Sequence, residues 1–258
     1  MEEVKSNERV FKLNVGELTR VDTDTSHFYF LDGEFMPSVS AILDQACPVE
    51  LGLKMFWQNN TKQDADKIFE DAGELGSKMH NAFELLLNGE ELNVLRDFPT
   101  EREKKILVSF VDWFKTFKPT NFIPEQSIAS KTFQYAGTLD LVADIDGEKW
   151  LIDFKTTSGI RFSHRLQVLA YKQAYEESYG VKIDRIGIAR FGTINRGRGG
   201  RIKNKWTGNA WEFEEVIGMS IDNFMDIYKT FLTLNGGNIP QPKEITVYPE
   251  FIRLLEEI

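Results

Sequence analysis

Residues 135–157 read YAGTLDLVADIDGEKWLIDFKTT and contain the pattern on which the predicted fold depends. Asp146 and Gly147 form a dipeptide favoured in two-residue hairpin turns, and Val, Leu, Ile, Trp and Phe recur on both sides of it. This pattern predicts two antiparallel strands joined by a tight turn.

The two-residue turn fixes the register of the predicted hairpin. Counting outward from the turn places Leu141 opposite Ile152 and Asp140 opposite Asp153. In the non-hydrogen-bonded geometry expected for the last pair, the two Cα atoms approach to about 4.5 Å. Two carboxylates in these positions repel each other, so the arrangement calls for a compensating cation.

Alternation along the strands divides the hairpin into a charged face and an apolar face. Thr138, Asp140, Asp153 and Lys155 are expected on the charged face. The residues expected on the apolar core face are Leu139, Leu141, Ala143, Ile145, Trp150, Ile152 and Phe154. Carboxylate oxygens suit Mg²⁺ or Mn²⁺, and Lys155 could reach toward an anion at the same metal. A solvent-exposed strand end with an incidental Asp-Lys pair is the alternative interpretation.

The motifs GTLD, ending at Asp140, and DFK, beginning at Asp153, resemble the core of the PD-(D/E)xK nucleases. The resemblance implies a restriction-endonuclease-like α/β fold, with a central mixed β-sheet flanked by helices, and hydrolysis of phosphodiester bonds. It implies that Asp140, Asp153 and Lys155 are catalytic. It also implies that His80, both aspartates and the backbone carbonyl of Phe154 hold one or two Mg²⁺ or Mn²⁺ ions.

Two further motifs resemble the branch of this superfamily that contains the RecB nuclease domain. His80 lies in GSKMHNAFE, within a helical pattern over residues 51–87, and matches the metal-binding histidine of that branch. Gln167 and Tyr171 stand one turn apart in the next helix and match its Gln-x-x-x-Tyr motif, which supports the site and contacts nucleic acid. Without the resemblance, all three would be ordinary helix positions.

Two acidic residues are candidates for a supporting role at the site. Glu84 follows His80 by one helical turn and shares its face. Glu125 lies in a strand expected over residues 122–129, and some relatives carry an acidic residue near this point. A surface carboxylate is an equally good interpretation of Glu125.

A second candidate contact with nucleic acid follows a strand expected over residues 183–191. The segment GTINRGRGGRIKNKW contains arginines and lysines but no acid, so it can neutralise phosphates, and Trp206 can stack on a base. A solvent-exposed hairpin loop is an equally good interpretation. The basic residues proposed to contact nucleic acid are Arg190, Arg196, Arg198, Arg201, Lys203 and Lys205.

Composition indicates an ordinary globular protein of 258 residues with a net charge of −9. This charge argues against a generally basic nucleic-acid coat and restricts such contacts to a local patch. The single cysteine, Cys47, excludes an internal disulfide and a cysteine-rich zinc site. Because the N-terminus lacks the apolar core of a signal peptide and no apolar run approaches a membrane span, we expect a cytoplasmic protein without membrane contact.

The chain is expected to form one large domain or a domain with an insertion. The predicted segments are an N-terminal hairpin and helix (1–50), a helical region packed on the core (51–120), the nuclease core (121–240) and a C-terminal tail (241–258). Residues up to about 25 are expected to be weakly structured, and the tail to contain a short helix. Ser38 and Ser163 are expected to begin helices.

The order of the motif residues is most similar to the mitochondrial genome maintenance exonucleases and related phage exonucleases. This similarity implies a metal-dependent DNA exonuclease whose substrate is single-stranded DNA or DNA with free ends, in recombination, repair or phage DNA processing. The alternatives are a structure-specific or restriction-type endonuclease, and a catalytically silent module that binds nucleic acid. The sequence identifies no protein partner.

Overall fold

The computed structural model describes residues 8–23, 26–192 and 210–242. The strands are β1 (Glu8–Leu13), β2 (Gly16–Asp22), β3 (His27–Leu31), β4 (Glu34–Met36), β5 (Thr120–Ser130), β6 (Tyr135–Ile145), β7 (Glu148–Lys155), β8 (Arg185–Phe191) and β9 (Trp211–Glu215). The helices are α1 (Val39–Ala46), α2 (Leu51–Asn59), α3 (Lys62–Leu87), α4 (Val94–Asp97), α5 (Glu101–Phe117), α6 (Phe162–Tyr179) and α7 (Ile221–Leu234).

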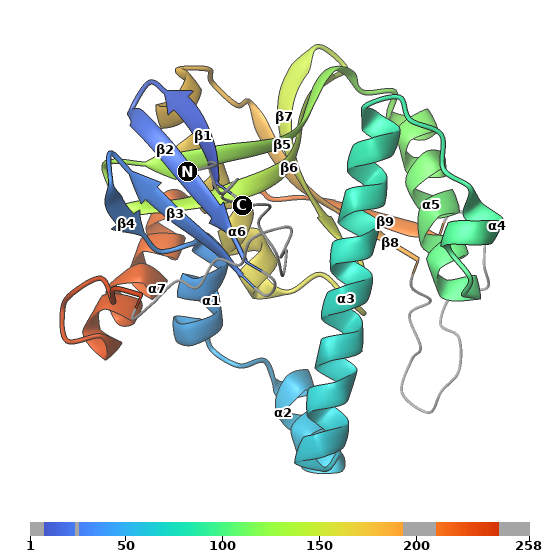
Figure 1. The fold of residues 1–258 in the computed structure, drawn as a ribbon, viewed down its shortest axis with the longest axis horizontal. Coiled ribbons are helices and arrows are strands. Elements are labelled where there is room, and N and C mark those ends of the chain that lie inside the picture. Colours follow the sequence, from blue (N-terminus) through green and yellow to red (C-terminus); the bar gives the residue numbers. More distant parts are fainter. Residues whose placement is uncertain (1–7, 24–25, 193–209, 243–258) are drawn as a thin grey trace, which may run out of the picture.

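The central sheet has the strand order β5-β6-β7-β8-β9 (Figure 1). Neighbouring strands are antiparallel except for β7 and β8, which are parallel and are connected through helix α6. A parallel pair requires such a crossover, whereas β6 and β7 need only a turn. The predicted mixed sheet is therefore present.

The predicted hairpin forms with the predicted register. Asp146 and Gly147 have φ angles of 52° and 82°, the positive values that a type I′ turn requires at both central positions. Leu141 lies opposite Ile152, which is the last pair of this ladder before the carboxylates.

The predicted separation of the two faces is wrong around Asp140. Leu139 packs with Val142 in the core beneath α6, whereas Leu141 packs in the core beneath α3 and α5. Strict alternation would place Leu139 and Leu141 on the same face. On the neighbouring strand, Glu125 has a φ of 42°, and the described β5–β6 ladder skips the position that pairs it with Asp140. A local distortion of both strands thus changes the direction of the side chains.

Helices cover both faces of the central sheet (Figure 1). Helices α1, α6 and α7 pack on one face, and α3 and α5 pack on the other. The second core is strongly aromatic, with the rings of Phe83 and Phe110 stacked at 4.3 Å and Phe154 of β7 inserted edge-on against both. Each buried aromatic side chain stabilises the fold by about 1.5–3 kcal/mol. This packing fixes the end of β7.

The N-terminal segment forms an antiparallel sheet in the order β1-β2-β3-β4. The expectation of weak structure before residue 25 is therefore wrong for Glu8–Leu13 and Gly16–Asp22. The hairpin expected within residues 1–50 is present as β3 and β4. Leu18 and Tyr29 pack against Ala129 and Ala136, so this sheet lies directly on the central sheet where β5 ends and β6 begins.

Helix boundaries agree with the prediction at some ends and differ at others. Ser38 caps α1 by accepting a hydrogen bond from the amide of Ala41, as expected. Helix α6 instead begins at Phe162, before the expected Ser163, because His164 accepts the amide hydrogen bond of Arg161. The expected tail helix lies outside the described residues. No helix in the described ranges combines the length and apolarity needed to cross a membrane.

Candidate active site

Three predicted catalytic residues lie where β6 and β7 cease to pair. Counting away from the turn, Asp140 and Asp153 come directly after the last ladder pair, Leu141–Ile152. Lys155 is the final residue of β7. The two aspartates do not form the predicted ladder pair within the described hairpin. Instead, the Asp140 carboxylate reaches across to β7, where its Oδ2 accepts a hydrogen bond of 2.6 Å from the amide of Phe154.

Asp140 also contacts helix α3. Its Oδ1 lies 2.9 Å from Nδ1 of His80, so one aspartate connects β6, β7 and α3. Burial opposes ionisation of Asp140, but His80, Lys155 and the Phe154 amide outweigh it and lower the pKa of this carboxyl group. Burial would likewise lower the pKa of His80, yet the charge of Asp140 and the contact with it raise that pKa. The contact with His80 therefore helps to keep Asp140 in the carboxylate form, the form that can bind a cation.

Asp153 is held in a different environment. The residue is 1% exposed, and burial, with the charge of Asp140 added, raises its pKa to about 6 despite the opposing effect of Lys155. Its Oδ2 forms an ion pair of 2.6 Å with Nζ of Lys155 but makes no hydrogen bond of acceptable geometry with any of the residues that the structure describes. A buried carboxylate oxygen with unused lone pairs is costly unless something else occupies them.

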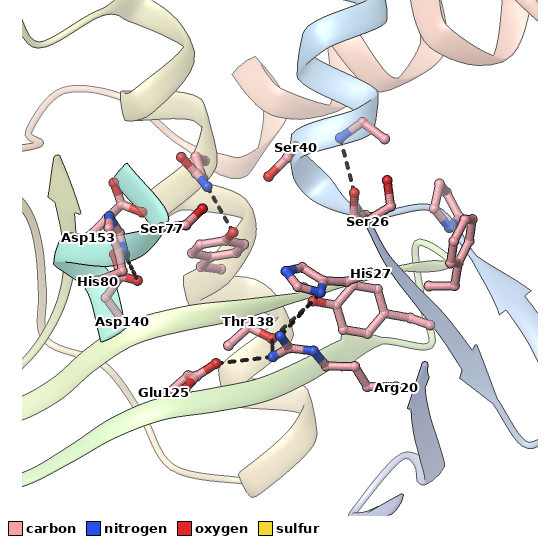
Figure 2. A pocket seen from close by; sticks show the side chains of 18 of the residues that line it. Arg20, Ser26, His27, Ser40, Ser77, His80, Glu125, Thr138, Asp140 and Asp153 are labelled. Atoms are coloured by element: carbon pink, nitrogen blue, oxygen red, sulfur yellow. Dashed lines mark hydrogen bonds and ion pairs between the residues drawn. The ribbon is translucent and has the colours of Figure 1, made fainter. Parts of the chain in front are cut away.

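These residues open into one cavity of about 1020 Å³. Figure 2 shows Asp140, Asp153 and His80 close together, with Arg20, Glu125 and Thr138 farther along the same cavity. The walls come from the N-terminal sheet, α1, α3, the ends of β5 to β7, and α6. Residues from the predicted N-terminal addition (1–50), the helical region (51–120) and the nuclease core (121–240) therefore meet at one site.

Gln167 and Tyr171 line this cavity from α6. The Gln167 amide donates a hydrogen bond of 2.8 Å to the Tyr171 hydroxyl, and Tyr171 is only 4% exposed. The tyrosine ring lies so close to Gly137 that an added Cβ would be 2.8 Å from Tyr171 Cε1. The glycine of the GTLD motif thus allows the ring to approach β6.

Glu84 and Glu125 also meet in the cavity. A hydrogen bond between the two carboxyl groups raises the pKa of Glu84 to about 7, with burial as a further cause. Burial opposes ionisation of Glu125, but the hydrogen bond with Glu84 and the contact with Arg20 lower its pKa. The pair can therefore share one proton near neutral pH.

A family model described as the PD-(D/E)XK nuclease superfamily matches residues 51–241. The chain belongs to this superfamily. Its mixed α/β architecture, with two sheets and seven helices in the described residues, is consistent with the predicted restriction-endonuclease-like fold.

Two solved structures are similar to this nuclease-superfamily chain. One is named "Putative exonuclease" from Eubacterium rectale; it has 14% identity and a TM-score of 0.44, with 86% of this chain and 90% of that chain covered. The other is named SSO0001; it has 12% identity and a TM-score of 0.29, with 62% of this chain and 72% of that chain covered. No curated protein matches the chain.

The residues of this superfamily member fit a hard divalent cation by their donor chemistry. Among the described residues, no three His, Cys, Asp or Glu side chains are gathered tightly enough to form a ready metal cluster. The buried Oδ2 of Asp153 nevertheless has only its ion pair with Lys155 within the described part of the chain, and it lies in the same cavity as Asp140 and His80. Carboxylate oxygens of this kind are the ligands that Mg²⁺ and Mn²⁺ prefer.

The basic residues predicted to contact nucleic acid do not lie with the other predicted site residues in the described structure. The prediction for Arg190 is not supported, because this side chain is 4% exposed and pairs with Glu212 at 2.7 Å, which leaves it no free surface for a phosphate. The remaining basic positions lie outside the described residues: Arg196, Arg198, Arg201, Lys203 and Lys205.

Sequence reasoning missed the contribution of the N-terminal sheet. Arg20 and Tyr29 reach the cavity from β2 and β3, and both contact Thr138 of β6. A strand whose buried face includes an arginine lacks the alternating apolar pattern that predicts a strand. Only a sequence motif that included residues of the N-terminal sheet could have identified Arg20 and Tyr29.

Proposed function

We propose that this protein is a metal-dependent DNA exonuclease with Asp140, Asp153 and Lys155 as its catalytic residues. One observation carries the proposal: both carboxylates, the lysine and His80 converge from β6, β7 and α3 on a single cavity. Membership of the nuclease superfamily supplies the reaction class, hydrolysis of a phosphodiester bond in nucleic acid.

Each residue has a distinct role in this proposal. His80, Asp140, Asp153 and the carbonyl of Phe154 would hold one or two Mg²⁺ or Mn²⁺ ions. Such an ion lowers the pKa of a bound water and stabilises charge on the scissile phosphate. Lys155, 2.6 Å from Asp153, orients the attacking water or offsets the negative charge that develops on the phosphate oxygens.

The shape of the site favours a strand end as the substrate. A cavity of about 1020 Å³ is at the upper end of the size range of small-molecule sites. Because the N-terminal sheet and α1 form walls as well as α3 and α6, a few nucleotides of single strand fit the space better than a continuous duplex. Gln167 and Tyr171 line this cavity, which supports the proposed contact of both side chains with nucleic acid.

A cytoplasmic location is part of the same proposal. The proposed substrate, DNA, is accessible to a cytoplasmic protein. A chain with a single cysteine is also compatible with a reducing compartment. Membrane association is not needed for this function.

Cleavage of labelled DNA with Mg²⁺ or Mn²⁺ tests the proposal. Single-stranded and duplex substrates, each linear and circular, are compared for the native protein, Asp153→Asn and Lys155→Ala. The expected result is loss of linear single strands, no cutting of circles, and at least about a hundredfold slower cleavage in both variants. Lys149→Ala is the matched control, since this lysine of β7 pairs with Asp144 outside the cavity lining.

Other outcomes would assign other functions. Cutting of circular DNA would identify an endonuclease. Binding of DNA without cleavage under either metal would identify a silent binding module. Full activity of Lys155→Ala would show that the lysine has no catalytic role.

A further inference from the structure

We propose that Arg20, on β2 of the N-terminal sheet, is a positioning residue for Asp140. This inference rests on the proposed metal-dependent function and extends its machinery beyond residues 51–241, the part matched by the family model. Arg20 touches neither His80 nor Asp140; it acts through Thr138 and Glu125, which flank Asp140 on β6 and β5.

Arg20 is unusually buried for an arginine. Its side chain is 6% exposed, and Nη1 donates hydrogen bonds of 3.0 Å to Thr138 Oγ1 and 3.2 Å to Glu125 Oε1 (Figure 2). Its Nε donates a bond of 2.7 Å to Asp22 Oδ1. Buried charges persist only when they are paired and hydrogen-bonded, so this guanidinium holds its partners in a defined geometry.

Asp140 lies at a gap in the regular pairing of its strand. Among the described pairs, the β5–β6 ladder includes Pro124–Leu141 and Gln126–Leu139 but skips Glu125–Asp140. The β6–β7 ladder ends at Leu141–Ile152. Asp140 therefore lacks a ladder partner of its own on either side, although the pairs at Leu139 and Leu141 adjoin it, so neighbouring side chains contribute to its position.

Arg20 supplies that support on both strands. Thr138 precedes Asp140 by two residues on β6, and its hydroxyl also lies 3.0 Å from the Tyr29 hydroxyl of β3. On β5, Glu125 adopts a φ of 42°, a left-handed conformation that is costly for a residue other than glycine. The bond from Arg20 stabilises the position of the Glu125 carboxylate and hence the distorted segment opposite Asp140.

Loss of a group that hydrogen-bonds directly to a metal-binding side chain typically weakens metal binding by roughly 10- to 100-fold. Arg20 reaches Asp140 only through Thr138 and Glu125, so we expect an effect at the lower end of this range. Simple electrostatics predicts the opposite for Arg20, because removing a positive charge from the cavity should tighten the binding of a cation. The sign of the change in metal affinity therefore distinguishes a positioning role of Arg20 from a purely electrostatic one.

Calorimetric titration with Mn²⁺ measures this sign without requiring DNA cleavage. The variants are Arg20→Met, Arg20→Lys, Glu125→Gln and Arg20→Met/Glu125→Gln, each first checked for folding by circular dichroism. Arg20→Lys keeps the charge in case Arg20→Met does not fold. Arg185→Met is the matched control, since Arg185 pairs with Glu215 at 2.9 Å and does not line the cavity.

We expect the Mn²⁺ Kd to rise about tenfold in each Arg20 variant and in Glu125→Gln, and to stay within about twofold in Arg185→Met. The double variant should bind no more weakly than Arg20→Met alone, because Arg20→Met already removes the contact between Arg20 and Glu125. Unchanged or tighter binding in the Arg20 variants would overturn the inference, as would fully additive losses.

Failure of the proposed function gives a different result. A native protein that binds Mn²⁺ but does not cleave DNA would refute the nuclease activity, while the change in Kd would still decide the role of Arg20. A native protein that does not bind Mn²⁺ would overturn both.

Discussion

Nδ1 of His80 lies 2.9 Å from Oδ1 of Asp140, although 60 residues separate the two in the chain. Buried neighbours on α3, Met79 and Phe83, anchor the helix against the central sheet and hold the imidazole at the cavity. The contact joins helix α3 to strand β6, which carries the first of the two catalytic aspartates in the proposed site.

His80→Ala should weaken Mn²⁺ binding by at least about tenfold, because it removes a nitrogen donor and the group that orients Asp140. Titration calorimetry measures the change. Asn81→Ala, at the next position of α3 and also at the cavity, is the matched control and should bind Mn²⁺ normally. Equal affinity in the two variants would exclude His80 from the metal site.

Mg²⁺ or Mn²⁺ should raise the Tm of the native protein but not that of Asp153→Ala. A ligand at a hundred times its Kd stabilises the folded state by about 2.7 kcal/mol, provided that it does not bind the unfolded chain. Here the ion would also relieve the repulsion between Asp140 and Asp153. Differential scanning fluorimetry with and without metal checks this, and equal shifts in the two proteins would contradict the assignment.

The sequence was sufficient to predict the β6–β7 hairpin, because Asp146-Gly147 fixes the turn and the apolar residues on both sides fix the register. It was not sufficient to predict the side-chain directions at Asp140. There the left-handed Glu125 distorts the neighbouring strand, and nothing in the identity of a glutamate indicates a φ of 42°.

Strands β1 and β2 of the N-terminal sheet were missed for a related reason. Arg20 is buried in β2, where alternation would call for an apolar residue, and its partner Glu125 lies 105 positions away in the chain. Local patterns report only neighbours close in sequence, so a strand whose buried face includes a paired arginine resembles a solvent-exposed segment.

Gly73→Ala should stabilise the protein by about 0.5–1 kcal/mol, because glycine in a helix interior costs conformational entropy. Gly73 lies within α3, and an added Cβ would meet no heavy atom within 4 Å. Gly137→Ala provides the contrast, since its Cβ would lie 2.8 Å from Tyr171 and should destabilise the fold. Urea denaturation measures both, and a loss of stability in Gly73→Ala would contradict the prediction.

Glu103→Gln should make stability less dependent on pH in the acidic range. The hydrogen bond from Lys78 is the main cause that lowers the pKa of Glu103 to about 2, and Thr100 contributes through the capping box of α5. Because the folded-state pKa is below the ordinary value of about 4.5, this stabilisation is complete above pH 4.5 and is lost as the pH falls toward 2. The variant should be less stable than the native protein at pH 7, by about 1–3 kcal/mol, and the difference should shrink at lower pH.

Urea denaturation at a series of pH values from 7 to about 3 measures this difference. Glu101→Gln is the matched control: its side chain is 81% exposed, two residues earlier on α5, and its only ion pair is a long one of 3.6 Å to Lys104 among the described residues. Exposed pairs of this kind contribute little, so the control should follow the native curve within about 0.5 kcal/mol. A constant gap between Glu103→Gln and the native protein across the series would show that the loss comes from altered packing and not from the ionised carboxylate.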